Sequence, residues 1–310
     1  MRKVLKGDAF FQGIVNVLMI IFLIIMVYPL LYVVSCSFSD PDAVNTGKVI
    51  LFPVGWSLAG YKLVFENRDI WIGYANTIFY TVAGTLINLA VTLPAAYALS
   101  RKELKGKNGI MIYFMITMYI GGGLIPSYLN IKSLGLLDTR GVLLILGALS
   151  VYNMIVARTF FASSIPYELT EAARIDGCNG FGIFAKIVMP LSKAITVVMI
   201  LYYGIGHWNA YFNAMIYLKD RNKFPLQMFL REILLTSKLA EEMLSNGSTL
   251  SAEEALALVE QAKSADLVKY CVIIVATLPM MVIYPKLQKY FEKGVMIGSV
   301  KGLGKTVAVL

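Results

Sequence analysis

The chain alternates between long apolar runs and polar segments. Each run is close to the roughly 20 residues that an α-helix needs to cross a bilayer, and none of the runs contains an Asp or a Glu. Runs of this length predict membrane-spanning helices rather than the buried helices of a soluble core. We therefore predict an all-α polytopic membrane protein with six transmembrane helices, at Ile14 to Val34, Tyr74 to Leu99, Ile110 to Tyr128, Val142 to Phe161, Ala194 to Tyr217 and Leu267 to Tyr284.

The first apolar run follows three basic residues, as the core of a cleavable signal peptide would. It is longer than the roughly 7 to 15 apolar residues of such a core, and no small-x-small cleavage site follows before Tyr32. We interpret the run as a helix that the protein retains.

Basic residues are distributed unevenly between the two sides of the predicted membrane. With both termini in the cytoplasm, the inner segments hold 16 basic and 6 acidic residues, whereas the outer segments hold 11 basic and 13 acidic residues. Because Lys and Arg accumulate on the cytoplasmic side of membrane proteins, this arrangement predicts cytoplasmic termini and a cytoplasmic segment between the fourth and fifth runs.

Composition agrees with a membrane protein and argues against nucleic acid as a partner. Of the 310 residues, 58% are hydrophobic and 15% are charged, with a mean hydropathy of +0.69. The net charge is +9. Anionic lipid and topology account for a basic surplus on the cytoplasmic flanks of apolar helices.

A polar island, Glu171-Ala172-Ala173-Arg174-Ile175-Asp176-Gly177, lies in the segment between the fourth and fifth runs. Acidic residues in its first turns complement the positive end of a helix dipole, and Gly177 supplies the left-handed conformation that ends many helices. A second short helix is predicted from Gly180 to Val188, stopped at Pro190. An ordinary amphipathic connector would have the same chemistry.

The spacing of this island resembles the cytoplasmic signature loop in the membrane subunits of binding-protein-dependent ABC importers. The match is Glu-Ala-Ala, three residues, Gly, nine residues, Ile, one residue, an apolar residue and Pro, with Met189 where the family usually has Leu. The resemblance implies that residues 162–193 form a cytoplasmic coupling loop. The residues implied to couple to the ATPase are Glu171, Ala172, Ala173, Asp176, Gly177, Ile187 and Pro190.

The same resemblance implies one transmembrane permease domain over residues 1–310, in the type I importer arrangement and in the bacterial cytoplasmic membrane. It implies four kinds of protein and lipid partner: a second homologous permease, two ATPase subunits, an extracytoplasmic solute-binding protein and membrane lipid. ATP and Mg²⁺ would bind in the ATPase partners, so we expect no cofactor and no catalysis in this chain. The segment that ends at Thr306 partly matches the phosphate-binding loop motif of nucleotide-binding proteins. It lacks the first glycine of that motif, because Ser299 occupies the position, so we predict no nucleotide site there.

Two stretches are similar to the sugar-importer branch associated with oligosaccharides such as alginate or rhamnogalacturonan fragments. They are Gly122-Gly123-Leu124-Ile125-Pro126 with the following Leu134-Gly135-Leu136-Leu137, and His207-Trp208-Asn209. The implied function is the transmembrane subunit of an ATP-driven importer that moves an oligosaccharide delivered by a solute-binding protein.

In that family the fifth span lines the translocation path, and this chain concentrates aromatic and amide residues there. Aromatic faces stack on the C–H faces of sugars, and amides supply directed donors and acceptors for hydroxyls. The candidate substrate-path residues are Tyr203, His207, Trp208, Asn209, Tyr211 and Asn213. An aromatic belt at the outer membrane interface is the alternative, and the lone histidine has no second metal ligand at a sensible spacing.

The second span carries a polar edge of amides and hydroxyls. We interpret these side chains first as hydrogen-bond partners of neighbouring helices and only then as substrate ligands. They are Asn76, Thr77, Thr81, Thr85, Asn88 and Thr92.

The segment 218–266 is predicted to be an extracytoplasmic loop with two helical stretches. One covers about Leu226 to Leu244, and the other opens with Ser251 and Glu254 as a capping box. By resemblance such a loop reaches the docked solute-binding protein, although an inert cap would have the same polar surface.

Two other classes of membrane protein fit less well. An ion- or proton-coupled secondary transporter would carry inverted repeats and an intramembrane acid, and the six predicted spans contain no acid. An integral-membrane enzyme would need a clustered catalytic set, and the chain has one histidine.

Overall fold

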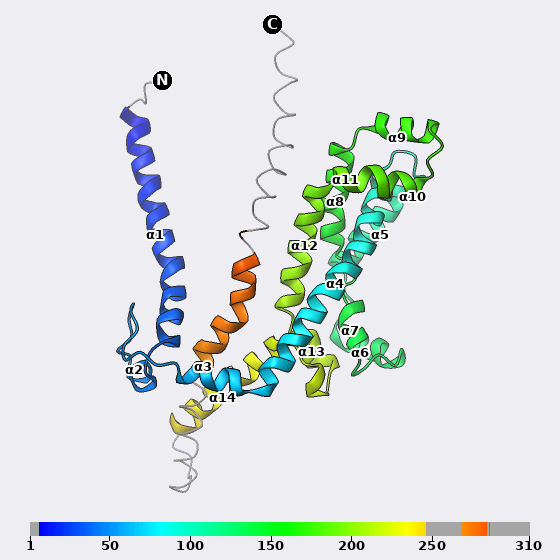
Figure 1. The fold of residues 1–310 in the computed structure, drawn as a ribbon. Coiled ribbons are helices and arrows are strands. Elements are labelled where there is room, and N and C mark those ends of the chain that lie inside the picture. The colour runs from blue at the N-terminus through cyan, green and yellow to red at the C-terminus, as the bar shows by residue number, and fades with distance from the viewer. Residues whose placement is uncertain (1–5, 246–267, 284, 286–310) are drawn as a thin grey trace. The chain divides into compact units, whose positions relative to one another are not determined.

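The computed structural model describes residues 6–245, 268–283 and 285, and within these ranges the chain is helical and has no strand. The all-α prediction is therefore confirmed. The longer helices, drawn in Figure 1, are α1 (Lys6–Ser37), α3 (Ala59–Glu66), α4 (Arg68–Ser100), α5 (Lys107–Tyr119), α6 (Leu124–Ser133), α8 (Val151–Ser164), α9 (Tyr167–Ile175), α12 (Lys193–Trp208), α14 (Leu226–Ser245) and the stretch Val268–Ile283. The shorter helical elements are α2 (Pro41–Asn45), α7 (Arg140–Ile145), α10 (Gly180–Ile183), a π turn (Phe184–Val188), α11 (Met189–Leu191), α13 (Phe212–Tyr217) and a 3₁₀ turn (Arg221–Lys223).

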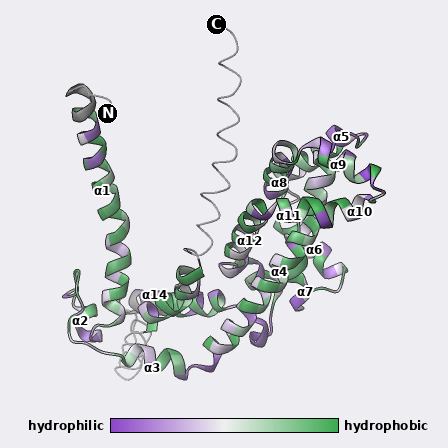
Figure 2. Cartoon of the chain, turned by 45° about the horizontal axis from the view of Figure 1, so that its top comes forward, coloured by the Kyte–Doolittle hydropathy of each residue, from purple (hydrophilic) through white to green (hydrophobic). Residues whose placement is uncertain are grey.

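The chain divides into two compact units, Met1–Ile70 with Leu230–Leu278 and Trp71–Phe229 with Pro279–Leu310. In the first unit, α1 is hydrophobic along most of its length (Figure 2), and most of its apolar side chains are exposed. Only its C-terminal end is packed. There the Tyr61 hydroxyl lies 2.9 Å from Ser37 Oγ, and the Cys271 thiol donates to the Ser37 carbonyl at 3.4 Å.

The second unit is built on α4, α8 and α12, which share one buried apolar cluster. Its members include Leu99 of α4, Phe161 of α8 and Met199 of α12, and it continues into the polar island through Ala173 and into α10 through Ile183. Figure 1 shows α9, α10 and α11 at one end of these helices and α6, α7 and α13 at the other. The polar island is therefore an outgrowth of the same core that the long helices bury.

The polar edge of α4 holds the second unit together, as the sequence predicts. Asn76 donates to the carbonyls of Asn222 and Phe224 at 2.7 and 3.0 Å, and it accepts from Arg140 at 3.0 Å. The Thr92 hydroxyl lies 2.7 Å from that of Tyr203 on α12. Asn76 and Thr92, both buried, thus bond to neighbouring segments, as polar groups in a membrane bundle do.

Three of the predicted continuous spans are interrupted in the structure. Between α5 and α6 the chain bends by 111° at residues 120–123, where Gly123 has a φ of +84°. The fourth predicted span breaks between α7 and α8, where Gly147 has a φ of +81°. The fifth breaks after Trp208. At the first two breaks, a glycine in the left-handed region releases the helix inside an apolar run.

Helix length alone therefore does not give the predicted number of six spans. Among the described residues, two helices are long and apolar enough to cross a bilayer, or up to four if each bent pair is one span. The helix Val268–Ile283, within the sixth predicted span, is shorter.

Of the two helices predicted in segment 218–266, one lies within the described residues. α14 covers the first of them almost residue for residue. The second, opened by Ser251, lies outside the described residues, as does the glycine-rich stretch near Thr306.

The buried polar edge of α4 supports a matched pair of stability variants. Thr77→Val removes the acceptor at 2.8 Å from the Leu226 N–H, and both residues are fully buried. Leaving that N–H without a partner should cost about 1–3 kcal/mol. Thr81→Val removes a buried hydroxyl that has no hydrogen-bond partner in the part of the chain that the structure describes, so the change should be neutral or stabilising.

The measurement is the thermal unfolding midpoint of each variant in lipid nanodiscs. Equal midpoints for Thr77→Val and Thr81→Val would show that the α4 hydroxyls do not act through these hydrogen bonds.

Candidate functional site

The polar island folds into a helix and a tight turn, as its start and stop signals predict. α9 begins after Pro166 with Glu168 in its first turn and ends at Ile175. Gly177 then takes a φ of +80°, and its N–H donates to the Arg174 carbonyl at 3.0 Å. This left-handed turn is the conformation for which glycine has no steric cost.

The second helix of the island runs further than predicted. Asn179 caps it, since its Oδ1 accepts from the Gly182 N–H at 2.7 Å. The chain continues through the π turn into α11, and an 84° bend separates it from α12 at Ser192. Pro190 does not stop this helix, because it occupies the first turn of α11, where a missing N–H is tolerated.

α9 is tied to the connection between α4 and α5 by polar contacts. Arg174 forms an ion pair with Glu103 at 3.1 Å. The backbone N–H of Glu103 lowers the pKa of its own carboxyl, and hydrogen bonds from Tyr167 and Arg174 lower it further. An exposed pair of this kind adds little stability, so its main effect is to orient α9.

The predicted coupling residues divide between the core and the surface. Ala173 is buried in the apolar cluster and Ile187 is half-buried. The remaining ones are exposed: Glu171, Ala172, Asp176, Gly177 and Pro190. Two large apolar side chains beside them are also exposed, Ile175 by 87% and Phe181 by 78%. The coupling surface, which we define as Glu171, Ala172, Ile175, Asp176 and Phe181, thus combines charge with apolar groups that water does not favour.

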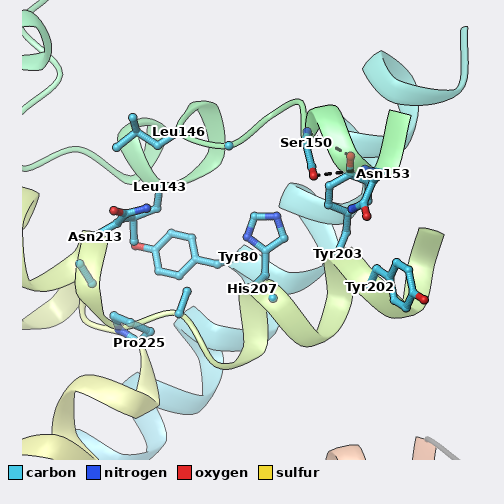
Figure 3. A pocket seen from close by; sticks show the side chains of 14 residues that line it. Tyr80, Leu143, Leu146, Ser150, Asn153, Tyr202, Tyr203, His207, Asn213 and Pro225 are labelled. Atoms are coloured by element: carbon cyan, nitrogen blue, oxygen red, sulfur yellow. Dashed lines mark hydrogen bonds between the residues drawn. The ribbon is translucent and has the colours of Figure 1, made fainter. Parts of the chain in front are cut away.

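A cavity of about 260 Å³ lies in the second unit, beside α12. Figure 3 shows that its lining side chains come from segments far apart in the sequence. They are Tyr80, Leu143, Leu146, Gly147, Ser150, Asn153, Tyr202, Tyr203, Gly206, His207, Ala210, Asn213, Ala214 and Pro225.

The polar groups of this cavity are hydroxyls, amides and one imidazole, with no carboxylate, ammonium or guanidinium among the lining residues. The side-chain amides of Asn153 and Asn213 form no hydrogen bond with any residue that the structure describes. Amides beside tyrosine rings can bind a polyhydroxyl solute through directed hydrogen bonds and ring stacking.

His207 stands among the lining residues in Figure 3 and is anchored to α4. Its Nε2 lies 2.7 Å from Asn88 Oδ1. Gly84 makes room for the ring, because a Cβ at that position would lie 2.5 Å from Cε1 and Nε2 of the imidazole. The cavity wall at His207 therefore depends on an amide and a glycine of a different helix.

The predicted substrate-path residues separate into two groups. Tyr203, His207 and Asn213 line the cavity. Trp208 is buried and packs edge-on against Tyr74, with ring centroids 6.3 Å apart. The last two, Asn209 and Tyr211, are exposed and lie outside the lining.

Residues 70–297 match the family described as "Binding-protein-dependent transport system inner membrane component". This range covers more than half of the chain. The chain belongs to this family of importer permeases.

Close relatives support the assignment along nearly the full length of this permease. It is 37% identical over 293 residues to the polygalacturonan/rhamnogalacturonan transport system permease protein YtcP of Bacillus subtilis, covering 94% of this chain and 98% of that protein. It is 38% identical over 278 residues to the protein LplC of the same organism, covering 90% of each chain.

A solved structure shows the same fold. The permease superposes with a TM-score of 0.82 on a chain of a bacterial ABC transporter involved in the import of the acidic polysaccharide alginate. The two are 35% identical, and the match covers 94% of this chain and 100% of the other. Permeases of this family carry no catalytic activity, because ATP hydrolysis belongs to a separate subunit. The family therefore excludes the secondary transporter and the membrane enzyme.

The cavity of the permease also includes residues that the sequence analysis did not select. Tyr80, Ser150 and Asn153 come from the second and fourth predicted spans. Asn153 carried a usable signal, since a lone amide inside an otherwise apolar stretch marks a cavity or an interhelical contact. Ser150 was less accessible to sequence reasoning, because it faces the cavity only through the break that precedes α8.

The close contact at Gly84 predicts a selective effect of adding one methyl group. Gly84→Ala should push the imidazole of His207 out of place and break its bond to Asn88, lowering transport by about tenfold. Gly204→Ala is the matched control, because its Cβ would meet only Thr85 Oγ1 at an ordinary 3.9 Å.

Transport by the two variants should be compared in proteoliposomes at equal protein content. Equal loss in both variants would contradict a specific role for the space at Gly84.

Proposed function

We propose that this permease is one of two homologous transmembrane subunits of an importer that moves an oligosaccharide across the bacterial cytoplasmic membrane. The observation that carries the proposal is the near full-length relationship to a permease named for polygalacturonan and rhamnogalacturonan transport. The related alginate transporter points in the same direction. The substrate class we propose is an oligosaccharide fragment of an acidic polysaccharide.

The chemistry of the cavity supports a sugar as cargo. Asn153 and Asn213, two amides without a hydrogen-bond partner among the described residues, line the same cavity as Tyr80 and Tyr202. Sugars need both surfaces, because their hydroxyls require directed hydrogen bonds and their C–H faces favour rings. The volume of about 260 Å³ suits a monosaccharide unit of a longer chain rather than the whole oligosaccharide.

The coupling surface is the proposed contact with the ATPase subunits, which bind ATP and Mg²⁺. It is built on α9 and α10, whose buried residues Ala173 and Ile183 share a core with α4, α8 and α12. A displacement of α9 by the ATPase would therefore move helices that line the cavity. ATP and the loaded binding protein can favour the outward-open state only if each binds that state more tightly.

The proposed topology has six spans, with both termini and residues 162–193 in the cytoplasm. The broken helices at residues 120–123, 146–150 and 209–211 count as parts of spans in this arrangement. Segment 218–266 would face the solute-binding protein on the outer side, and the second permease would complete a heterodimer.

The exposed apolar pair of the coupling surface provides the test. Ile175→Ser combined with Phe181→Ser removes apolar area that only a partner would bury, so binding of the ATPase should weaken at least tenfold. Phe52→Ser is the control, since this side chain is 75% exposed in the segment after α1.

The readouts are co-purification of the ATPase and ATP hydrolysis stimulated by the binding protein loaded with a galacturonic acid trisaccharide. Full ATPase binding and stimulation in the double variant would refute the coupling surface. Absence of stimulation in the native complex would refute the proposed sugar class.

A further inference from the structure

The amide of Asn88 has only one orientation that satisfies its surroundings. The side chain is 1% exposed, and its Nδ2 donates to the carbonyls of Gly147 and Ala148 at 2.7 and 2.8 Å. Both of these partners can only accept hydrogen bonds, so both protons of the amide nitrogen are in use. The oxygen Oδ1 must therefore be the atom that faces His207.

This orientation requires a proton on Nε2 of the imidazole. Oδ1 of Asn88 carries lone pairs only, and it lies 2.7 Å from Nε2 of His207. A hydrogen bond at this distance requires the proton on Nε2. In the neutral ring the other nitrogen, Nδ1, then has no proton and is an acceptor.

Nδ1 has no protein partner among the described residues, while the Nε2 edge of the ring is packed against Gly84. The ring itself stands between Tyr80 and Tyr203 at the cavity, as Figure 3 shows. The acceptor is therefore available to a bound solute.

The cavity lining offers a carboxylate no charged partner, and Arg140, which lies beside the Tyr80 hydroxyl, is engaged by Asn76 Oδ1 at 3.0 Å. None of its lining residues is Lys or Arg. A carboxylate that leaves water without a pairing charge carries a large desolvation penalty, and a second lone pair facing it would add repulsion. A hydroxyl, by contrast, can donate to Nδ1 and accept from the amides of Asn153 or Asn213.

We propose that Asn88 holds His207 as a fixed hydrogen-bond acceptor, so that this subunit binds its cargo through sugar hydroxyls and not through sugar carboxylates. The inference rests on the proposed function and adds which face of the sugar this chain recognises. In this assignment His207 contacts the substrate directly, and Asn88 is a positioning residue that acts through the imidazole.

The tautomer can be measured without knowing the substrate. The chain contains a single histidine, so nitrogen NMR of the importer complex labelled in this chain with ¹⁵N-histidine, minus the spectrum with His207→Gln, isolates one ring. At neutral pH we expect one protonated and one unprotonated nitrogen, with the proton on Nε2. A proton on Nδ1, or on both nitrogens, would overturn the proposal.

A transport assay distinguishes recognition of sugar hydroxyls from recognition of sugar carboxylates. The probes are a galacturonic acid trisaccharide and its methyl ester, each delivered by the binding protein. His207→Gln moves the side-chain amide to the position of Nε2 and leaves that of Nδ1 empty, so KM should rise about five- to tenfold for both probes. His207→Asn places an amide near the position of Nδ1 and should restore most of the loss.

A rise in KM confined to the acidic trisaccharide would overturn the proposal, because it would show that His207 pairs with the carboxylate as an imidazolium. If the native complex transports neither probe, the proposed sugar class fails, and the NMR spectrum still decides the state of His207.

Discussion

A hydrogen-bonding group inside a bilayer must find its partner within the protein, because hydrocarbon supplies none. α4 meets this requirement at Asn76, Thr77, Asn88 and Thr92, which bond to residues 59 to 149 positions further along the chain. Asn76 holds the segment that leads into α14, Asn88 holds the break before α8, and Thr92 holds α12 through Tyr203. The packing of the second unit follows from these pairings, since each one fixes where another element lies along α4.

The same hydrogen bonds determine which polar groups of the cavity are already bonded to protein. Asn76, Asn88 and Thr92 of α4 bond to protein, whereas the amides of Asn153 and Asn213 line the cavity without a hydrogen-bond partner among the described residues. His207 belongs to both sets, because one ring nitrogen is bound to α4 and the other is not. The apolar cluster beneath the cavity continues to Ala173 in the polar island. In the proposed importer, a protein that binds this island would act on the helices around the cavity through close-packed side chains, because a close-packed interior is barely compressible and transmits displacement.

Sequence patterns predicted the helical class, the polar island with its Gly177 turn and the role of the α4 polar edge. These features depend on local chemistry: an apolar run long enough for a bilayer, a glycine at a left-handed position, amides on an otherwise apolar helix. The break at Gly147 was not predicted, because hydropathy measures the length of an apolar run and is insensitive to a local change of direction. Trp208 was predicted to line the substrate path because its side chain is aromatic. Its actual position against Tyr74 depends on tertiary packing. Neighbours far apart in sequence, such as Gly84 and His207, leave no trace in spacing.

The most direct test of this division of roles is an electron cryo-microscopy structure of the assembled importer trapped with its oligosaccharide. The account predicts sugar density in contact with Asn153, Asn213 and His207, while Asn76 and Asn88 keep their bonds to backbone carbonyls. Sugar bonded to Asn76 or Asn88, or sugar bound away from this cavity, would contradict it.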